Sequence, residues 1–243
     1  MMKAKGVSTR DTLFGGDLFV YQRKGGYRFS VDSVLLAHHA LSDCGETLLD
    51  MGCGCGIMAF IMAHRCPDLK KVVGIEIQEG LANLARMAAE ENSFSPEVSI
   101  VHGDILNALP KGSPTAFDTL ISNPPYTPLG KGRVNPSSEK ATCRHEFTLT
   151  LEALVARSAE LIHGSGTCHF VYPVERLKEL ESACANHGLY PTRLRLVCSK
   201  SGDAPSRVLF SCSLRPSSMV TLPPLVVHKA DGSLTDEVNR LFK

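Results

Sequence analysis

Short apolar runs alternate with amphipathic stretches through most of the chain. The runs at 47–51, 71–76 and 98–101 have the length of buried strands. In residues 57–64 and 78–92, apolar side chains recur at helical spacing. Strands that alternate with helices predict an α/β fold, with a mostly parallel sheet and helices on both faces.

The same alternation continues in the second half of the chain. We predict strands at 117–121, 166–172, 189–198 and 207–214, an edge strand at 223–228, and helices at 150–163, 174–187 and 234–242. No helical segment separates the strands at 189–198 and 207–214, so they predict a hairpin. The last major strand is therefore expected to run antiparallel to the others.

Residues 1–41 contain two short apolar runs about Gly15-Gly16, followed by a helical segment. We expect one domain over 1–243, with a hairpin-and-helix extension at 1–41, a core at 42–215 and a strand-and-helix appendage at 216–243. A length of 243 residues with 43% apolar content suits one large domain.

Nine cysteines without a repeated spacing predict reduced thiols and a cytoplasmic protein rather than a disulfide framework. No apolar run approaches the roughly 20 residues of a membrane span. A net charge of +1 indicates no particular partner. Basic residues nevertheless gather near residue 28 and in the polar segment 127–147, where they are candidates for contact with a phosphate backbone: Arg28, Lys131, Arg133 and Arg144.

A glycine loop at residues 52–56 follows the first core strand and precedes a helix. Such a loop brings backbone N–H groups and a helix N-terminus close to a ligand. The loop also fits a dinucleotide fingerprint through Gly54, Gly56 and Ala59, with Glu76 about 20 residues further on. A nicotinamide oxidoreductase therefore remains an alternative function. Asp50 argues against it, because a carboxylate there repels a pyrophosphate and attracts a cation.

No metal site is predicted. Cys53 and Cys55 lie in the glycine loop without further ligands, and the adjacent His38 and His39 point in different directions on a helix.

Three acids stand at or near the ends of successive strands: Asp50, Glu76 and Asp104. Parallel strands bring such ends to one edge of the sheet, so the acids predict a single crevice that holds a positively charged nucleoside.

The tetrapeptide Asn123-Pro124-Pro125-Tyr126 follows the strand at 117–121. Two prolines fix two φ angles and leave carbonyl oxygens, beside the Asn123 side chain, as acceptors next to an aromatic ring. This combination suits a planar group that carries N–H donors. An ordinary loop turn is the alternative.

Taken together, these motifs resemble those of class I S-adenosylmethionine-dependent methyltransferases. The resemblance implies a Rossmann-like sheet of seven strands with the last antiparallel, and S-adenosylmethionine as cofactor. It implies catalysis by Asn123, Pro124, Pro125 and Tyr126 on an amino nitrogen conjugated to a planar system. The implied cofactor contacts are Phe29, Ser30, Asp50, Gly52, Gly54, Gly56, Glu76, Ile77, Asp104 and Asn123.

Residues 13–22 and 26–37 are similar to the N-terminal signature of the bacterial valine-tRNA adenine-N6 methyltransferases. That family implies methylation of adenine 37 and a tRNA anticodon arm as partner. Enzymes that methylate rRNA guanine N2 or a release-factor glutamine use the same tetrapeptide, so both reactions remain alternative functions. Release-factor enzymes normally carry a separate helical N-terminal domain. A non-catalytic RNA-binding module also stays open.

Overall fold

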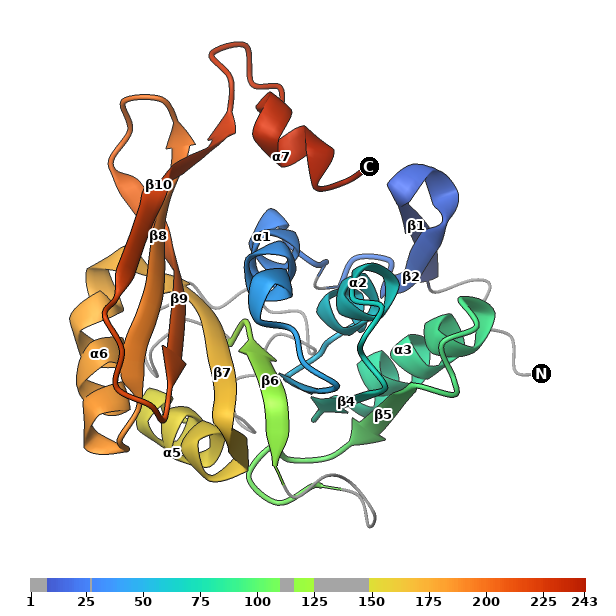
Figure 1. Cartoon of the computed structure of the whole chain (residues 1–243). Coiled ribbons are helices and arrows are strands. Elements are labelled where there is room, and N and C mark those ends of the chain that lie inside the picture. The colour runs from blue at the N-terminus through green and yellow to red at the C-terminus, as the bar shows by residue number, and fades with distance from the viewer. Residues whose placement is uncertain (1–7, 27, 110–115, 125–148) are drawn as a thin grey trace.

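An eight-stranded sheet forms the centre of the computed structural model, which describes residues 8–26, 28–109, 116–124 and 149–243 (Figure 1). The strands lie in the order β10-β8-β9-β7-β6-β3-β4-β5. Their bounds are β3 Thr47–Met51, β4 Lys71–Glu76, β5 Val98–His102, β6 Phe117–Ser122, β7 Ile162–Pro173, β8 Tyr190–Lys200, β9 Pro205–Ser213 and β10 Val220–His228. The α/β prediction is confirmed.

Strand direction follows the sequence prediction in the core. β3 pairs in parallel with β4 and β6, β4 with β5, and β6 with β7. β9 runs antiparallel to both β7 and β8, as the helix-free connection predicts. The eighth strand is β10, which starts at Val220 instead of residue 223 and lies parallel to β8. Its long pairing with β8 makes it a full member of the sheet.

Helices cover both faces of the sheet (Figure 1). They are α1 Val31–Ala40, α2 Ile57–Arg65, α3 Glu79–Glu91, α5 Leu151–Leu161, α6 Leu177–Asn186 and α7 Asp236–Arg240. Alternate side chains of β3 face the two layers, because strand residues point to opposite sides. Leu48 packs with α1, α2 and α3, whereas Leu49 packs with α5 and α6. Within the described residues, no helix is both long and apolar enough to cross a bilayer.

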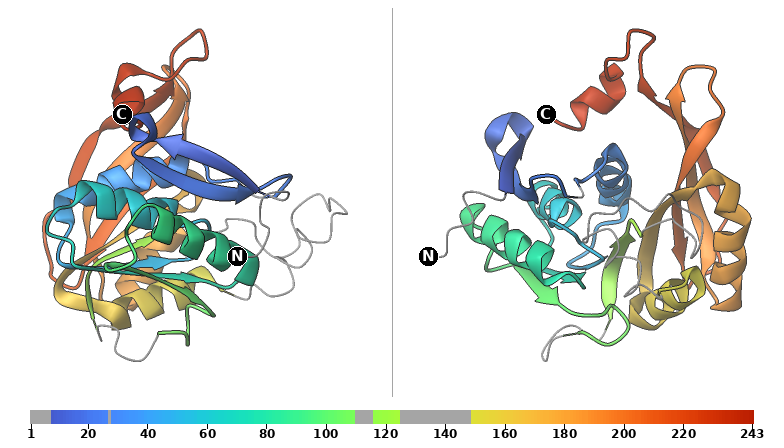
Figure 2. Two further views of the ribbon diagram at one scale, coloured as in Figure 1. Left: turned by 90° about the vertical axis from the view of Figure 1, so that its right-hand side faces the viewer. Right: turned by 180° about the vertical axis from the view of Figure 1, so that it is seen from behind.

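Both chain ends pack beside the helical layer that contains α1. The predicted N-terminal hairpin is β1 Ser8–Leu13 and β2 Leu18–Arg23, which pair antiparallel. The backbone N–H of Phe14, at the tip of this hairpin, donates to the carbonyl of Phe242 at 2.9 Å. Figure 2 shows the C-terminal segment beside the hairpin in both views. The two terminal segments therefore stabilise each other.

One predicted helix end is wrong. Thr150 caps α5 by accepting from the Ala153 N–H at 3.1 Å, as its sequence position predicts. The helix ends at Leu161, however, and β7 begins at Ile162, two residues before the glycine expected to stop it. Ile162 pairs with Phe117 of β6 and is buried, so tertiary pairing overrides the local helical pattern.

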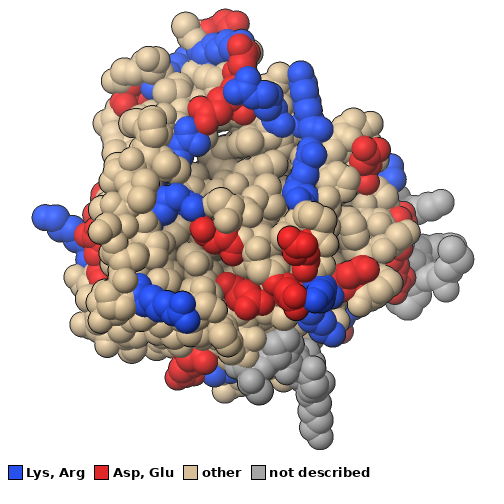
Figure 3. Space-filling model, in the orientation of Figure 1, with Lys and Arg blue, Asp and Glu red and all other residues tan. Residues whose placement is uncertain are grey.

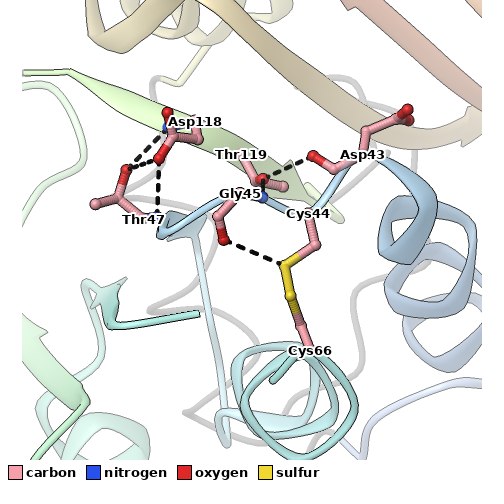
Figure 4. The surroundings of a disulfide bond; sticks show 7 residues. All are labelled: Asp43, Cys44, Gly45, Thr47, Cys66, Asp118 and Thr119. Carbon is pink, nitrogen blue, oxygen red and sulfur yellow. Dashed lines mark hydrogen bonds between the residues drawn. A yellow bond between two sulfur atoms is a disulfide. The ribbon is translucent and has the colours of Figure 1, made fainter. Parts of the chain in front are cut away.

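A disulfide joins Cys44 to Cys66, which contradicts the expectation of reduced thiols throughout (Figure 4). It connects the loop before β3 to the residue after α2, at the opposite end of β3 from the glycine loop. Gly45 beside it donates to the Thr119 hydroxyl at 3.1 Å. The two cysteines are 22 residues apart and only the fold brings them together. The other described cysteines are free and buried.

Acidic and basic side chains are interspersed on the face in Figure 3. This mixture agrees with the net charge of +1. Among the described residues on this face, Lys and Arg side chains form small groups and no broad basic surface of the kind that attracts a phosphate backbone.

Candidate active site

A pocket lies where the glycine loop meets the start of α1 and the end of β6. Its walls come from four parts of the chain: Phe29 and Ser33 near the start of α1, residues 52–55 and the first turn of α2, Leu81 of α3, and Asn123 after β6. The lining residues are Phe29, Ser33, Gly52, Cys53, Gly54, Cys55, Ile57, Met58, Leu81 and Asn123. The sequence prediction named four of these, Phe29, Gly52, Gly54 and Asn123.

Alternating glycines allow the loop to turn sharply. Gly52, Gly54 and Gly56 all have positive φ, at 82°, 57° and 84°, a backbone conformation that residues other than glycine rarely adopt. The N–H groups of Gly52 and Cys53 both donate to the Ile75 carbonyl of β4, at 2.9 and 3.0 Å. The loop is therefore fixed to the neighbouring strand before it enters α2.

The Gly56→Ala variant is expected to lose roughly 3 kcal/mol of unfolding free energy, from left-handed backbone strain plus a steric clash. An added Cβ would lie 2.6 Å from the Phe60 ring. Gly202→Ala is the matched control, because Gly202 also has positive φ (87°) but open space around it. Chemical denaturation measures both variants. Equal losses would show that the Phe60 contact carries no cost.

Cys53 and Cys55 fill the spaces between the glycines. Cys53 lies against Gly74 of β4, where an added Cβ would be 2.9 Å from its sulfur. Burial raises the pKa of Cys55 to about 12, and burial beside Asp50 and Glu76 raises the pKa of Cys53. Both are therefore neutral packing residues. Among the described residues, no cluster of His, Cys, Asp or Glu suits a metal.

Asp50 lies fully buried beneath the loop, at the N-terminus of α2. Its Oδ2 accepts from the Ala59 N–H at 3.2 Å, while Oδ1 is buried without a hydrogen-bond partner among the described residues. Burial raises the pKa of Asp50 to about 8, opposed by the Ala59 N–H and reinforced by Glu76. A positive charge bound nearby would favour the ionised carboxylate.

Glu76 holds the loop from β4. Its carboxylate accepts from the Gly54 N–H at 2.9 Å and from the Gln78 N–H at 2.8 Å. Burial raises the pKa of Glu76, although these two N–H groups act against the shift. Asp50 and Glu76 thus lie behind the loop instead of in the pocket lining. Glu76 connects the loop backbone to β4, whereas Asp50 connects the first turn of α2 to β3.

Three further predicted cofactor residues, Asp104, Ile77 and Ser30, are not part of the pocket lining. Asp104 is exposed after β5, and its Oδ1 accepts from the Leu106 N–H at 3.0 Å. The Ile77 carbonyl is 3.0 Å from His102 Nε2. Ser30 is the N-cap residue of α1 without a side-chain cap bond.

Asn123 directly follows β6, and its side chain reaches α1. Its Nδ2 donates to Ser33 Oγ at 2.9 Å. Pro124 comes next in the chain. Pro125 and Tyr126, together with Lys131, Arg133 and Arg144, lie outside the described residues.

Arg28 is on the hairpin side of the pocket. Its guanidinium contacts the Asp11 carboxylate at 2.7 Å and Thr9 Oγ1 at 3.1 Å. The next residue, Phe29, lines the pocket, so Arg28 lies next to the site but is paired with the hairpin.

Six lining residues were not predicted as site residues: Ser33, Cys53, Cys55, Ile57, Met58 and Leu81. Cys53 and Cys55 stand between predicted glycines, so their place in the pocket lining could have been inferred from the sequence. Ser33 carried no local signal, because only the contact between α1 and β6 places it there.

The site fits an adenosine cofactor that carries a positive charge. The glycines leave their part of the wall free of side chains, and Oδ1 of Asp50, which has no hydrogen-bond partner among the described residues, is a buried acceptor close to it. The strand order, with its antiparallel β9, and this strand–loop–helix cradle define a class I S-adenosylmethionine-dependent methyltransferase. Residues 27–136 match the family described as "Methyltransferase small domain", which spans the pocket.

Curated relatives identify the particular family. A tRNA1(Val) (adenine(37)-N6)-methyltransferase of Porphyromonas gingivalis is 32% identical over 88% of this chain and 86% of its own length. Relatives of the same name from Bacteroides fragilis and Vibrio campbellii are 32% and 26% identical, over 79% and 97% of this chain and 79% and 95% of their own lengths. The chain belongs to the tRNA1(Val) (adenine(37)-N6)-methyltransferase family.

Solved structures share the fold. A predicted O-methyltransferase from Agrobacterium tumefaciens superposes with a TM-score of 0.64 at 20% identity, covering 86% of this chain and 94% of that one. The methyltransferase subunit of a type I restriction-modification system from Streptococcus thermophilus gives 0.60 at 16% identity, covering 88% and 52%. The predicted α/β fold and cofactor class are confirmed. β10, which corresponds to the predicted edge strand, adds to the seven strands that the resemblance implies.

Proposed function

We propose that this enzyme methylates N6 of adenine 37 in the anticodon arm of a valine tRNA. The observation that carries the proposal is the similarity to tRNA1(Val) (adenine(37)-N6)-methyltransferases over 88% of the chain. The placement of Asn123 in the wall of the pocket agrees with it. When bound, S-adenosylmethionine supplies an electrophilic methyl group on a positively charged sulfur.

Asn123 and Pro124 act on the adenine amine in this proposal. The amine is a poor nucleophile because its lone pair is delocalised into the ring. The Asn123 side-chain oxygen and the Pro124 carbonyl accept hydrogen bonds from its two N–H groups. These bonds favour a pyramidal nitrogen with an available lone pair. Pro125 rigidifies the backbone and Tyr126 stacks on the base. The displaced proton leaves after transfer, when the methylated nitrogen is cationic and acidic, so no strong base is needed. Alignment of the reacting atoms supplies much of the acceleration.

The loop and the strand-end acids hold the cofactor. Gly52, Gly54 and Gly56 leave space for its methionine portion, and Asp50 beneath them balances its positive charge. Glu76 accepts from the ribose hydroxyls and Asp104 from the adenine amine. The remaining contacts are assigned to Phe29, Ser30 and Ile77.

In this proposal, Arg28 beside the pocket and the basic residues of the polar segment 127–147 hold the tRNA: Lys131, Arg133 and Arg144. The target base must leave its stack to reach a pocket walled by Asn123. These basic side chains then hold the phosphates on either side of the extruded nucleotide.

Methyl transfer from tritiated cofactor to two valine tRNA transcripts, with adenine or guanine at position 37, tests the proposal. Labelled N6-methyladenosine is expected only with adenine 37, after digestion and nucleoside analysis. Total tRNA from a strain that lacks the gene is the positive substrate. Label in guanine, in adenine elsewhere, or in a release-factor glutamine would overturn the assignment.

A further inference from the structure

We propose that Ser33 is a positioning residue that orients the Asn123 amide for methyl transfer. The inference rests on the proposed function and extends it to the N-terminal helix. Ser33 lies in the first turn of α1, is only 6% exposed, and lines the same pocket as Asn123. Its Oγ accepts from Asn123 Nδ2 at 2.9 Å across a separation of 90 residues.

The backbone of Asn123 is already fixed by its neighbours. Ser122, the last residue of β6, donates its hydroxyl to the Met51 carbonyl of β3 at 2.8 Å. Pro124 restricts the backbone on the other side. Rotation about the side-chain bonds remains, and the hydrogen bond to Ser33 limits it. In a planar amide, fixing the nitrogen also fixes the direction of the carbonyl oxygen.

The N-terminal hairpin holds the segment that leads into α1 and Ser33. The Phe29 N–H donates at 2.7 Å to Oε1 of Gln22, which is buried in β2. Nε2 of Gln22 in turn donates to the Asp11 carboxylate of β1. The Ser33 N–H donates to the Ser30 carbonyl at 3.2 Å in the first turn of α1. The hairpin thus fixes Phe29, the backbone continues to Ser30 and the first turn of α1, and Ser33 in that turn bonds Asn123.

Loss of the hydrogen bond between Ser33 and Asn123 is expected to slow methyl transfer more than it weakens substrate binding. An Asn123 side chain turned by half a rotation about its Cβ–Cγ bond would present N–H groups to an amine that already carries hydrogens. Loss of the Ser33 hydroxyl therefore removes the correct alignment of an acceptor in the transition state. A loss of this kind lowers kcat and leaves KM nearly unchanged.

A double-mutant cycle tests the inference, with Ser33→Ala, Asn123→Ala and the double variant. We expect Ser33→Ala to lower kcat about tenfold, with tRNA KM and cofactor Kd within about threefold. The double variant should be no slower than Asn123→Ala, because Ser33 acts through Asn123. Ser158→Ala is the matched control, since Ser158 is buried and its hydroxyl donates to the Leu154 carbonyl within α5. It should keep the wild-type kcat.

A second measurement does not depend on activity. In protein labelled with 15N-asparagine, one Asn123 side-chain N–H proton should exchange slowly, and it should lose this protection in Ser33→Ala but not in Ser158→Ala. An unprotected wild-type Asn123 amide, a wild-type kcat in Ser33→Ala, or multiplicative losses in the double variant would each overturn the inference. An inactive wild-type enzyme with a protected Asn123 amide would overturn the proposed function instead.

Discussion

Asn123→Ala is expected to reduce kcat for tRNA methylation by about 100-fold or more, the size of loss seen when a preorganised transition-state contact is removed. Cofactor Kd should stay within about threefold, because the glycine loop, Asp50 and Glu76 are unaffected. Asn123 is partly buried, lines the pocket and directly follows β6, so a water molecule in place of its side chain would not be held in the same orientation. Single-turnover methyl transfer and isothermal titration measure the two quantities.

The matched control for this variant is Asn186→Ala. Asn186 is an exposed amide at the end of α6, where Nδ2 donates to Glu152 Oε1 at 3.4 Å. It should retain full activity. Turnover of Asn123→Ala equal to that of Asn186→Ala would show that the acceptor assigned to Asn123 takes no part in the reaction.

Asp50→Asn is expected to weaken cofactor binding at least tenfold at pH 8 while it stabilises the cofactor-free protein at that pH. Burial raises the pKa of Asp50 from 3.8 to about 8. Between these values the unfolded chain loses the proton and the folded chain keeps it. Wild-type stability therefore falls as pH rises from about 4 to about 8, by up to roughly 1.4 kcal/mol per pH unit.

Binding of a cationic cofactor favours the ionised Asp50, so wild-type affinity should increase as pH rises from 6 to 8, up to about tenfold per unit. Asp50→Asn should have weaker affinity with less dependence on pH. Some pH dependence of the affinity should remain in Asp50→Asn, because burial raises the pKa of Glu76 as well. Thermal unfolding and calorimetric titration across this range, with the exposed Asp17→Asn as control, measure both effects. A pH-independent wild-type Kd would contradict the assignment of Asp50.

The core fold could be predicted from sequence because its elements have strong local patterns. Residues 47–51 and 71–76 are strands with the predicted bounds, and the helix-free connection gave the antiparallel β9. The end of α5 was wrong, since strand pairing at Ile162 competes with a continuing helical pattern. The expectation of reduced thiols throughout was also wrong, because two distant cysteines carry no local signal of their contact.

The sequence by itself determined the loop, the strand-end acids and the tetrapeptide, because each depends on residue types at close spacing. Only the tertiary structure placed Asp50 and Glu76 behind the loop, where burial raises their pKa values. Only it brought Ser33 to Asn123. Burial and contacts between distant segments arise when helices pack on a sheet, and that packing sums many weak interactions that no short motif records.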